Sequence, residues 1–337
     1  MRNLTGLAYA IAGSSLARQT FAPSENSLTT VLYHGFFFGN EAKSHARERL
    51  RKQLDWLRRT YNPLTLDQYQ QAIAVGELPP RSLLVTADDA MVDLLEVQDE
   101  FREFAVPLTV YVCAGWTAQA SALEADGLLA RVVTTIEWYA GPVATFQVGS
   151  ESRVILLGRE HRSATIDQLL TSREYYAPHL EEILERVRQT AGAPRASTIC
   201  SWTELNSLRK RGIQFGSHSV THIRLAPASD VRLNFEITEA KRLIDRKLGP
   251  CSSFAYPFGI DGTCDERTTT ALKRAGVTTA FMTNPGFASK DTSYFHLPRF
   301  ALPERHMTQA EYCGRVRGGG VALRRLKNFL SPKNPSR

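Results

Sequence analysis

Short apolar or β-branched runs alternate with amphipathic helical patterns along most of this 337-residue chain. The helical pattern Ser44–Thr60 is typical, because Leu50, Leu54 and Leu57 recur at helical spacing among Arg and Lys. Strands that alternate with helices predict βαβ units, and therefore an α/β fold with a parallel sheet or barrel. In such folds the functional side chains follow the carboxyl ends of the strands. The expected strands are Leu28–Tyr33, Ser82–Thr86, Leu108–Cys113, Ile213–Gly216, Ser253–Tyr256 and Val277–Met282.

Further helical patterns lie between these runs, and a glycine follows three of them. Gly212, Gly249 and Gly276 stand where the C-caps of helices are expected. The predicted helices are Val92–Phe104, Trp202–Arg211, Asp230–Leu248 and Asp265–Ala275.

The stretch Thr117–Ser201 interrupts this alternation for more than eighty residues. It contains the helical patterns Leu128–Tyr139 and Pro178–Thr190 and the strand-like runs Ala144–Val148 and Arg153–Leu157. A connection of this length normally has structure of its own. We therefore expect residues 117–201 to form an insertion that folds over the mouth of a barrel.

The composition is that of a globular protein, with 43% hydrophobic and 22% charged residues. No apolar run approaches the roughly 20 residues of a membrane-spanning helix. The five cysteines are scattered and form no C-x-x-C pair, so we expect reduced core thiols instead of disulfides or a structural zinc knuckle.

The N-terminal segment 1–27 allows two interpretations. Arg2 followed by Leu4–Ala12 loosely resembles a signal peptide, but Thr5, Gly6 and Tyr9 interrupt its short apolar part. We expect a short packed helix and a cytoplasmic protein. Export through a weak N-terminal signal is the alternative.

The positive charge is concentrated at the C-terminus. Residues 303–337 contain eight Lys or Arg and two Glu, so they carry +6 of the net charge of +7. A nearly neutral body without interleaved aromatic residues or a nucleic-acid motif argues against nucleic-acid binding. The basic tail, 304–337, includes the amphipathic pattern Val321–Leu330. We expect this tail either to dock on the barrel or to contact an anionic membrane, and binding to a membrane should weaken as salt rises.

Two adjacent carboxylates, Asp88 and Asp89, follow the run Leu83–Thr86. Carboxylates at this spacing repel each other unless a cation compensates their charge. Neighbouring side chains on an extended chain point in opposite directions, so one carboxylate can bind a metal while the other stays free. The alternative is a helix N-cap with acidic residues in the first turn.

Two histidines, His218 and His222, follow the strand end at Gly216-Ser217. If this segment turns helically, a separation of four residues lets both imidazoles reach one point. The alternative is a pair of unrelated histidines on a loop. With one carboxylate of the aspartate pair, the set becomes two His and one Asp, which leaves an open position for water, as in catalytic zinc sites.

Three motifs each follow a predicted strand. They are Thr86-Ala87-Asp88-Asp89, Gly216-Ser217-His218-Ser219-Val220-Thr221-His222 and Phe254-Ala255-Tyr256-Pro257-Phe258-Gly259. Together they resemble the polysaccharide deacetylases, the NodB-like domain of carbohydrate esterase family 4. The resemblance covers residues 28–303, with the insertion matching loosely, and continues in Phe235–Ile237, Leu248-Gly249 and Leu297–Arg299.

The resemblance implies a distorted (β/α)7 barrel that removes N- or O-acetyl groups from sugars with a bound metal. By the same resemblance Asp89, His218 and His222 are the metal ligands and Asp88 is the catalytic base. The expected metal is zinc, although other divalent ions suit this ligand set.

The resemblance also implies a catalytic acid in a Leu-x-His motif, which many members carry near the C-terminus. Here Phe295-His296-Leu297 does not match, whereas Leu32-Tyr33-His34 does, at a strand end. This arrangement resembles the circularly permuted branch that includes bacterial exopolysaccharide deacetylases. We therefore assign the acid to His34; a buried structural histidine is the alternative.

Three alanines depart from the family pattern. Ala87 and Ala90 stand where the family usually has Phe and Gly, and Ala255 stands where it has an Arg that contacts the catalytic aspartate. Ala90 is the harder to accommodate if the backbone there needs a conformation that favours glycine. Arg299 is a candidate to replace the missing charge from another strand.

The predicted function is metal-dependent removal of acetyl groups, most simply N-acetyl, from a polysaccharide or oligosaccharide intermediate in exopolysaccharide biosynthesis. We assign oxyanion and substrate binding to Tyr256, Pro257, Phe258 and Arg299. The alternative is a catalytically inactive carbohydrate-binding protein on the same barrel.

Overall fold

A computed structural model describes residues 27–38, 41–121, 127–139, 141–149, 153–190 and 198–321. The predicted N-terminal helix and residues 322–337 of the basic tail lie outside these residues. Among the described residues, no helix combines the length and apolar character needed to cross a membrane. The chain divides into two compact units, one of residues 27–87, 93–109 and 281–321, the other of residues 88–92 and 110–280.

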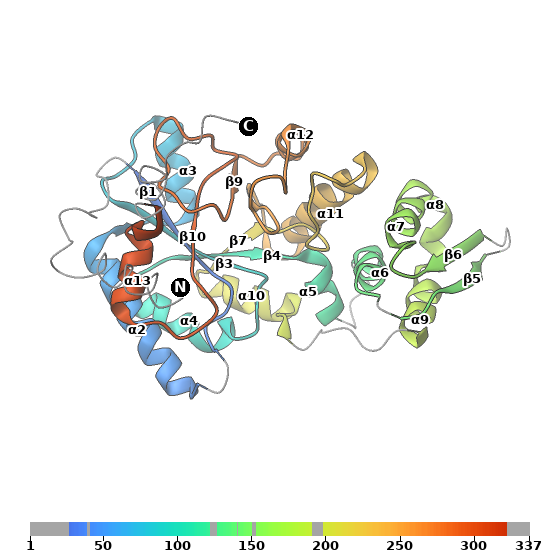
Figure 1. Cartoon of the computed structure of the whole chain (residues 1–337), viewed down its shortest axis with the longest axis horizontal. Coiled ribbons are helices and arrows are strands. Elements are labelled where there is room, and N and C mark those ends of the chain that lie inside the picture. The colour runs from blue at the N-terminus through green and yellow to red at the C-terminus, as the bar shows by residue number, and fades with distance from the viewer. Residues whose placement is uncertain are drawn as a thin grey trace, which may run out of the picture. The chain divides into compact units, whose positions relative to one another are not determined.

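The first unit is built around parallel strands (Figure 1). The strand β1 (Leu28–Tyr33) pairs with β3 (Ser82–Asp88) and with β10 (Phe300–Ala301), and β2 (Asn62–Pro63) also pairs with β3. Every residue of β1 and β3 is buried, as expected for a parallel sheet covered on both faces. The helices of this unit are α2 (Lys43–Thr60), α3 (Leu66–Val75), α4 (Leu94–Glu103) and α13 (Gln309–Val316).

Helix α2 shows why these segments are helical. Its buried face includes the predicted stripe Leu50, Leu54 and Leu57. Its polar face contacts α4 through ion pairs, including one between Arg47 Nε and Glu100 Oε1 at 2.6 Å. Burial of the stripe therefore fixes the orientation of α2, and the ion pairs fix its contact with α4.

The second unit also alternates strands with helices. The strand β7 (Gln214–Ser217) pairs in parallel with β8 (Ser253–Ala255). The strand β4 (Leu108–Val112) begins at the boundary of the two units, and β9 (Thr279–Phe281) ends there. The helices outside the insertion are α10 (Trp202–Lys210), α11 (Asp230–Leu248) and α12 (Glu266–Arg274).

The predicted insertion belongs to the second unit. An antiparallel hairpin of β5 (Ala144–Val148) and β6 (Arg153–Leu157) packs with helices, and α7 contacts α11 (Figure 1). A position over the mouth of a complete barrel involves both units and stays a prediction. The helical segments of this region are α5 (Ala114–Ala120), α6 (Leu128–Glu137), α7 (Arg162–Thr171), α8 (Arg173–Tyr176), the 3-10 turn η1 (Ala177–His179) and α9 (Leu180–Thr190).

Candidate active site

The aspartate pair lies where β3 ends and the chain turns. Asp88 is the last residue of β3, and its side chain is 1% exposed, whereas that of Asp89 is 17% exposed. Asp89 and Ala90 both have left-handed backbone conformations, with φ of 70° and 57°. The N-cap of α4 is Asp93, so the alternative that the aspartate pair caps this helix is wrong.

The segment after the aspartate pair is held by backbone hydrogen bonds. The N–H of Cys200 donates to the carbonyl of Ala90 at 2.9 Å, and the N–H of Val92 donates to that of Thr198 at 3.0 Å. These bonds fix the turn that directs the Asp89 side chain.

The two histidines converge through a loop and not through a helical turn, the condition that the argument from their spacing had set. His218 follows β7 directly, and its N–H donates to the carbonyl of Val112 in β4 at 2.9 Å. Ser219 and His222 have φ of 67° and 57°, and the N–H of His222 donates to Ser219 Oγ at 3.0 Å. The left-handed residues reverse the chain within the motif and return His222 toward His218.

A buried carboxylate supports this loop from α11. Glu236 is completely buried, and its Oε2 accepts the N–H groups of Val220 and Thr221, each at 2.9 Å. Its Oε1 accepts Arg232 Nε at 2.8 Å. A buried carboxylate needs such compensation, because an unpaired charge in a protein interior is costly. The loop between the two histidines is therefore held in place through its backbone N–H groups, which bind the Glu236 carboxylate.

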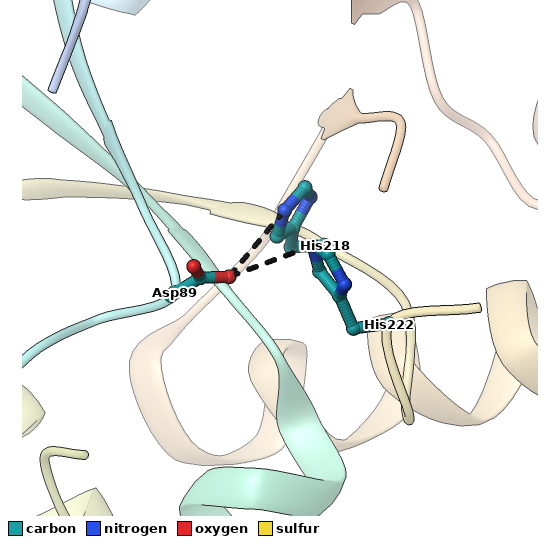
Figure 2. A group of neighbouring side chains, drawn as sticks. All are labelled: Asp89, His218 and His222. Carbon is teal, nitrogen blue, oxygen red and sulfur yellow. Dashed lines mark ion pairs between the residues drawn. The ribbon is translucent and has the colours of Figure 1, made fainter. Parts of the chain in front are cut away.

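The side chains of Asp89, His218 and His222 converge on one point. Figure 2 shows both imidazoles beside the Asp89 carboxylate, and Asp89 Oδ1 lies 3.6 Å from His218 Nε2 and 3.7 Å from His222 Nε2. The three candidate ligand atoms lie within 4.8 Å of one another. Around one zinc ion, tetrahedral ligand atoms stand roughly 3.4 Å apart if each bond is about 2.1 Å.

The hydrogen bond of His218 also fits a metal site. Its Nδ1 lies 2.7 Å from the carbonyl oxygen of Ala255 in β8. Because a carbonyl oxygen only accepts, Nδ1 carries the proton and Nε2 keeps the lone pair that a metal needs. The three residues therefore suit a divalent metal in both spacing and chemistry.

Asp88 lies beside this group. Its Oδ2 is 3.7 Å from His218 Nε2, and the side chain is almost completely buried. The structure thus brings together all four residues that the sequence predicts for the ligands and the base. The division of roles between base and ligands stays a prediction.

Aromatic residues surround His222. Its ring centroid lies 5.2 Å from that of Trp116 and 4.8 Å from that of Phe258, and Trp116 in turn lies 5.1 Å from Trp138. Phe258 is 45% exposed and has a φ of 62°. The guanidinium carbon of Arg224 lies 5.4 Å from the centre of the Phe258 ring. Phe258 is therefore an accessible residue of the predicted substrate-binding turn.

Three of the four predicted substrate-binding residues are buried. Tyr256 is completely buried against Phe254, and this burial raises the pKa of its hydroxyl. Pro257 is also buried. Arg299 is completely buried in the first unit, where Nε donates to the carbonyl of Met282 at 2.8 Å and Nη1 to Thr86 Oγ1 at 3.3 Å. Direct substrate contact by the side chains of Tyr256 and Arg299 is therefore not supported, because neither reaches the surface.

His34, the predicted acid, belongs to the first unit and follows β1. Its side chain is 31% exposed, so it is not the buried histidine of the alternative, and its Nδ1 lies 3.8 Å from Glu304 Oε1. Asp93 holds the next residues, because its Oδ2 accepts the N–H groups of Phe36 at 2.5 Å and Phe37 at 3.3 Å. The catalytic role of His34 stays a prediction.

Several residues of this region have no role in the sequence-based prediction. The sequence signal for Arg232 and Glu236 is their spacing, since they form an i, i+4 ion pair on a helix whose other face is apolar. Trp116 and Trp138 carry no such signal, since tryptophans after a strand and within an insertion are equally expected in a core.

Comparisons with known proteins agree with this geometry. The family model described as polysaccharide deacetylase matches residues 76–280, which is more than half of the chain. Comparison with curated proteins finds no match.

Solved structures of low sequence identity share the fold. A Streptococcus pyogenes deacetylase, PplD in complex with acetate, is 16% identical with a TM-score of 0.54, and the match covers 83% of this chain and 93% of that one. IcaB from Ammonifex degensii is 15% identical with a TM-score of 0.54 and coverages of 87% and 98%. A de-N-acetylase from Aggregatibacter actinomycetemcomitans is 12% identical with a TM-score of 0.53 and coverages of 90% and 100%.

These findings confirm the predicted fold class, in which a curled parallel sheet with covering helices forms the (β/α)7-type barrel of these enzymes. The family is generally metal-dependent, and the Asp89, His218 and His222 group suits a metal. The alternative of an inactive carbohydrate-binding protein is therefore not retained. The chain belongs to the polysaccharide deacetylase family and is a polysaccharide deacetylase.

Proposed function

We propose that this enzyme hydrolyses N-acetyl groups of amino sugars in a polysaccharide or oligosaccharide intermediate, with a divalent metal, zinc, at Asp89, His218 and His222. The observation that carries the proposal is the convergence of these three ligand atoms within 4.8 Å, with Asp88 beside them. One structural neighbour is a de-N-acetylase, which supports an amide as the bond that is cleaved.

The metal, when bound, lowers the pKa of a coordinated water and polarises the acetyl carbonyl. Asp88 accepts the proton of the water that attacks this carbonyl. The backbone N–H at Phe258 donates to the oxyanion that develops, and His34 protonates the amine that leaves.

The roles of the two aspartates can be separated by experiment. Asp88→Asn should retain metal and lose most turnover, because the base is removed while the ligands remain. Asp89→Asn should weaken metal binding itself. The measurements are metal content after purification and acetate release from an acetylated chito-oligosaccharide, with and without a chelator.

His218→Ala is the control for the ligand assignment, since it removes one of three protein ligands. A His218→Ala protein with one equivalent of metal would contradict the metal centre. Equal metal loss in Asp88→Asn and Asp89→Asn would contradict the division between base and ligand. Activity that a chelator leaves unchanged would argue against the metal-dependent mechanism.

We also propose a biological setting, exopolysaccharide biosynthesis at the cytoplasmic face of a membrane. The support is the charge of the C-terminal tail, of which residues 322–337 lie outside the described part of the chain. Each Lys or Arg near an anionic surface contributes about 1 kcal/mol of binding. The five basic residues of this segment are Arg324, Arg325, Lys327, Lys333 and Arg337.

Co-sedimentation with vesicles that contain acidic lipid tests membrane contact. The full chain should sediment at low salt and be released at high salt, while a chain that ends at Arg317 should stay in solution. If both forms stay in solution at low salt, the tail does not bind membranes.

A further inference from the structure

The end of helix α6, within the insertion, approaches the metal-ligand loop through two consecutive residues. Glu137 is the last residue of α6 and Trp138 is its C-cap. Neither residue takes part in the proposed chemistry. Each begins a separate series of contacts that leads to the loop between His218 and His222.

The first series is polar and centres on the buried Arg232. Glu137 Oε2 accepts Arg232 Nη2 at 3.2 Å, and the same nitrogen donates to Thr221 Oγ1 at 2.7 Å. Arg232 is 5% exposed and also contacts Glu236, the carboxylate that binds two backbone N–H groups of the loop. Arg162 Nη1, 3.9 Å from Glu137 Oε1, adds a second positive charge.

The composition of this network makes its geometry strict. Two carboxylates and two guanidinium groups balance in charge, and most of their surface is removed from water. Removal of one member would leave a buried charge uncompensated, which forces neighbouring groups to move. The guanidinium of Arg232 therefore links the position of Glu137 to that of Thr221.

The second series is aromatic. Trp138 lies 5.1 Å from Trp116, and Trp116 lies 5.2 Å from His222, between ring centroids. The helix that carries Trp116 is itself bonded to the loop, since the N–H of Ala114 donates to the carbonyl of Ser219 at 3.0 Å. Trp116 is thus held between the insertion and the candidate ligand His222.

Gly115 shows how closely α6 approaches the loop. A Cβ atom on this glycine would lie 2.1 Å from Thr134 Oγ1 in α6 and 2.6 Å from the carbonyl oxygen of Val220. Only a residue without a side chain fits between them. Three sets of contacts therefore connect the insertion to the segment Ser219–His222.

We propose that Glu137 and Trp138 are positioning residues through which the insertion sets the location of His222 and so the affinity of the metal site. The inference rests on the proposed function for the assignment of His222 as a ligand. Groups that orient metal ligands typically change metal affinity 10- to 100-fold when they are mutated. The insertion would then act on the metal site itself.

The test uses the full-length protein and the variants Glu137→Gln and Trp138→Leu. The matched control is Glu182→Gln on α9, which makes the same chemical change in an exposed ion pair of the insertion, with Arg186 at 3.0 Å. Zinc affinity is measured by competition with a chromophoric chelator, and the visible spectrum of the cobalt form reports the geometry of the ligands. Thermal unfolding of the metal-free proteins measures fold stability separately.

Both test variants should bind zinc about 10-fold more weakly than the wild type or worse, with an altered cobalt spectrum, while Glu182→Gln should match the wild type. If Glu137→Gln does not fold, Trp138→Leu decides alone. Wild-type zinc affinity and an unchanged cobalt spectrum in the folded test variants would overturn the inference, even if their metal-free forms unfold earlier. A wild type that binds neither metal would instead refute the metal centre of the proposed function.

Discussion

Ala90 is under backbone strain, and the size of that strain can be measured by comparing Ala90→Gly with the glycine variant of an unstrained buried alanine. Its φ of 57° lies in the left-handed region, and the residue is completely buried. A left-handed conformation costs an L-residue roughly 1–2 kcal/mol, whereas glycine adopts it freely. Ala90→Gly should therefore recover about this amount.

Two losses oppose the gain. The variant gives up a buried methyl group, worth about 0.8 kcal/mol, and the added freedom of the unfolded chain costs about 0.4–1 kcal/mol. The net change in the free energy of unfolding should be close to zero. Ala255→Gly is the matched control, because Ala255 is equally buried, lies in the same unit and is not among the residues of positive φ. Ala255→Gly should incur both losses with no release of strain, so its free energy of unfolding should fall by about 1–2 kcal/mol.

Urea unfolding followed by tryptophan fluorescence measures this difference. Trp116, Trp138 and Trp202 belong to the same unit as Ala90 and Ala255, so the signal reports mainly on that unit. If Ala90→Gly loses as much stability as Ala255→Gly, the left-handed conformation carries no measurable strain and the reasoning is refuted. Metal affinity should be unchanged in Ala90→Gly, because glycine adopts the same left-handed conformation in the turn that follows Asp89.

Two further predictions concern the first unit. His34→Ala should lower acetate release on the order of 10²- to 10⁴-fold at unchanged metal content, whereas His296→Ala should be mild; the reverse ranking would place the acid at His296. Burial raises the pKa of Asp93, although hydrogen bonds from Phe36 and Phe37 lower it in part. An unfolded chain titrates Asp93 near its ordinary pKa of about 3.9. Because the pKa is higher in the folded state, protonated Asp93 stabilises the fold fully below that pH, and this stabilisation is lost as the pH rises through the folded-state pKa. Unfolding over a pH series should show this slope in the wild type and not in Asp93→Asn, and an identical slope in both would contradict the assignment to Asp93.

Hydrophobic periodicity predicted the elements that bury a regular stripe or run. Leu28–Tyr33 and Asp230–Leu248 match β1 and α11 to the residue, and so do the two strands of the insertion hairpin. Helix α5 has no expected counterpart, because its sequence Ala114–Ala120 is rich in small residues and shows no apolar stripe. It is stabilised by its contacts with α6 and the ligand loop, which only the fold reveals.

The site was predicted in its residues but not in its backbone. Strand ends and residue chemistry were enough to group Asp88, Asp89, His218 and His222. The left-handed residues that join the two histidines were not foreseen, since a spacing of four also suits a helix. Tyr256 was assigned to substrate binding from its motif, yet a motif does not reveal burial, and its side chain lies in the core.

The two histidines are held by different contacts, and this difference indicates which of the two ligands can change position. His218 is fixed by secondary structure, because its N–H bonds to Val112 in β4 and its Nδ1 bonds to Ala255 in β8, and its side chain is 1% exposed. His222 lies at the far end of the loop, is 19% exposed, and depends on Trp116 and on the Glu236 network for its position. A change in the insertion should therefore reach the metal through His222 while His218 keeps its place. In a chain whose barrel strands hold one histidine and whose insertion supports the other, the strength of metal binding becomes a property that the insertion can alter without any change to the ligands.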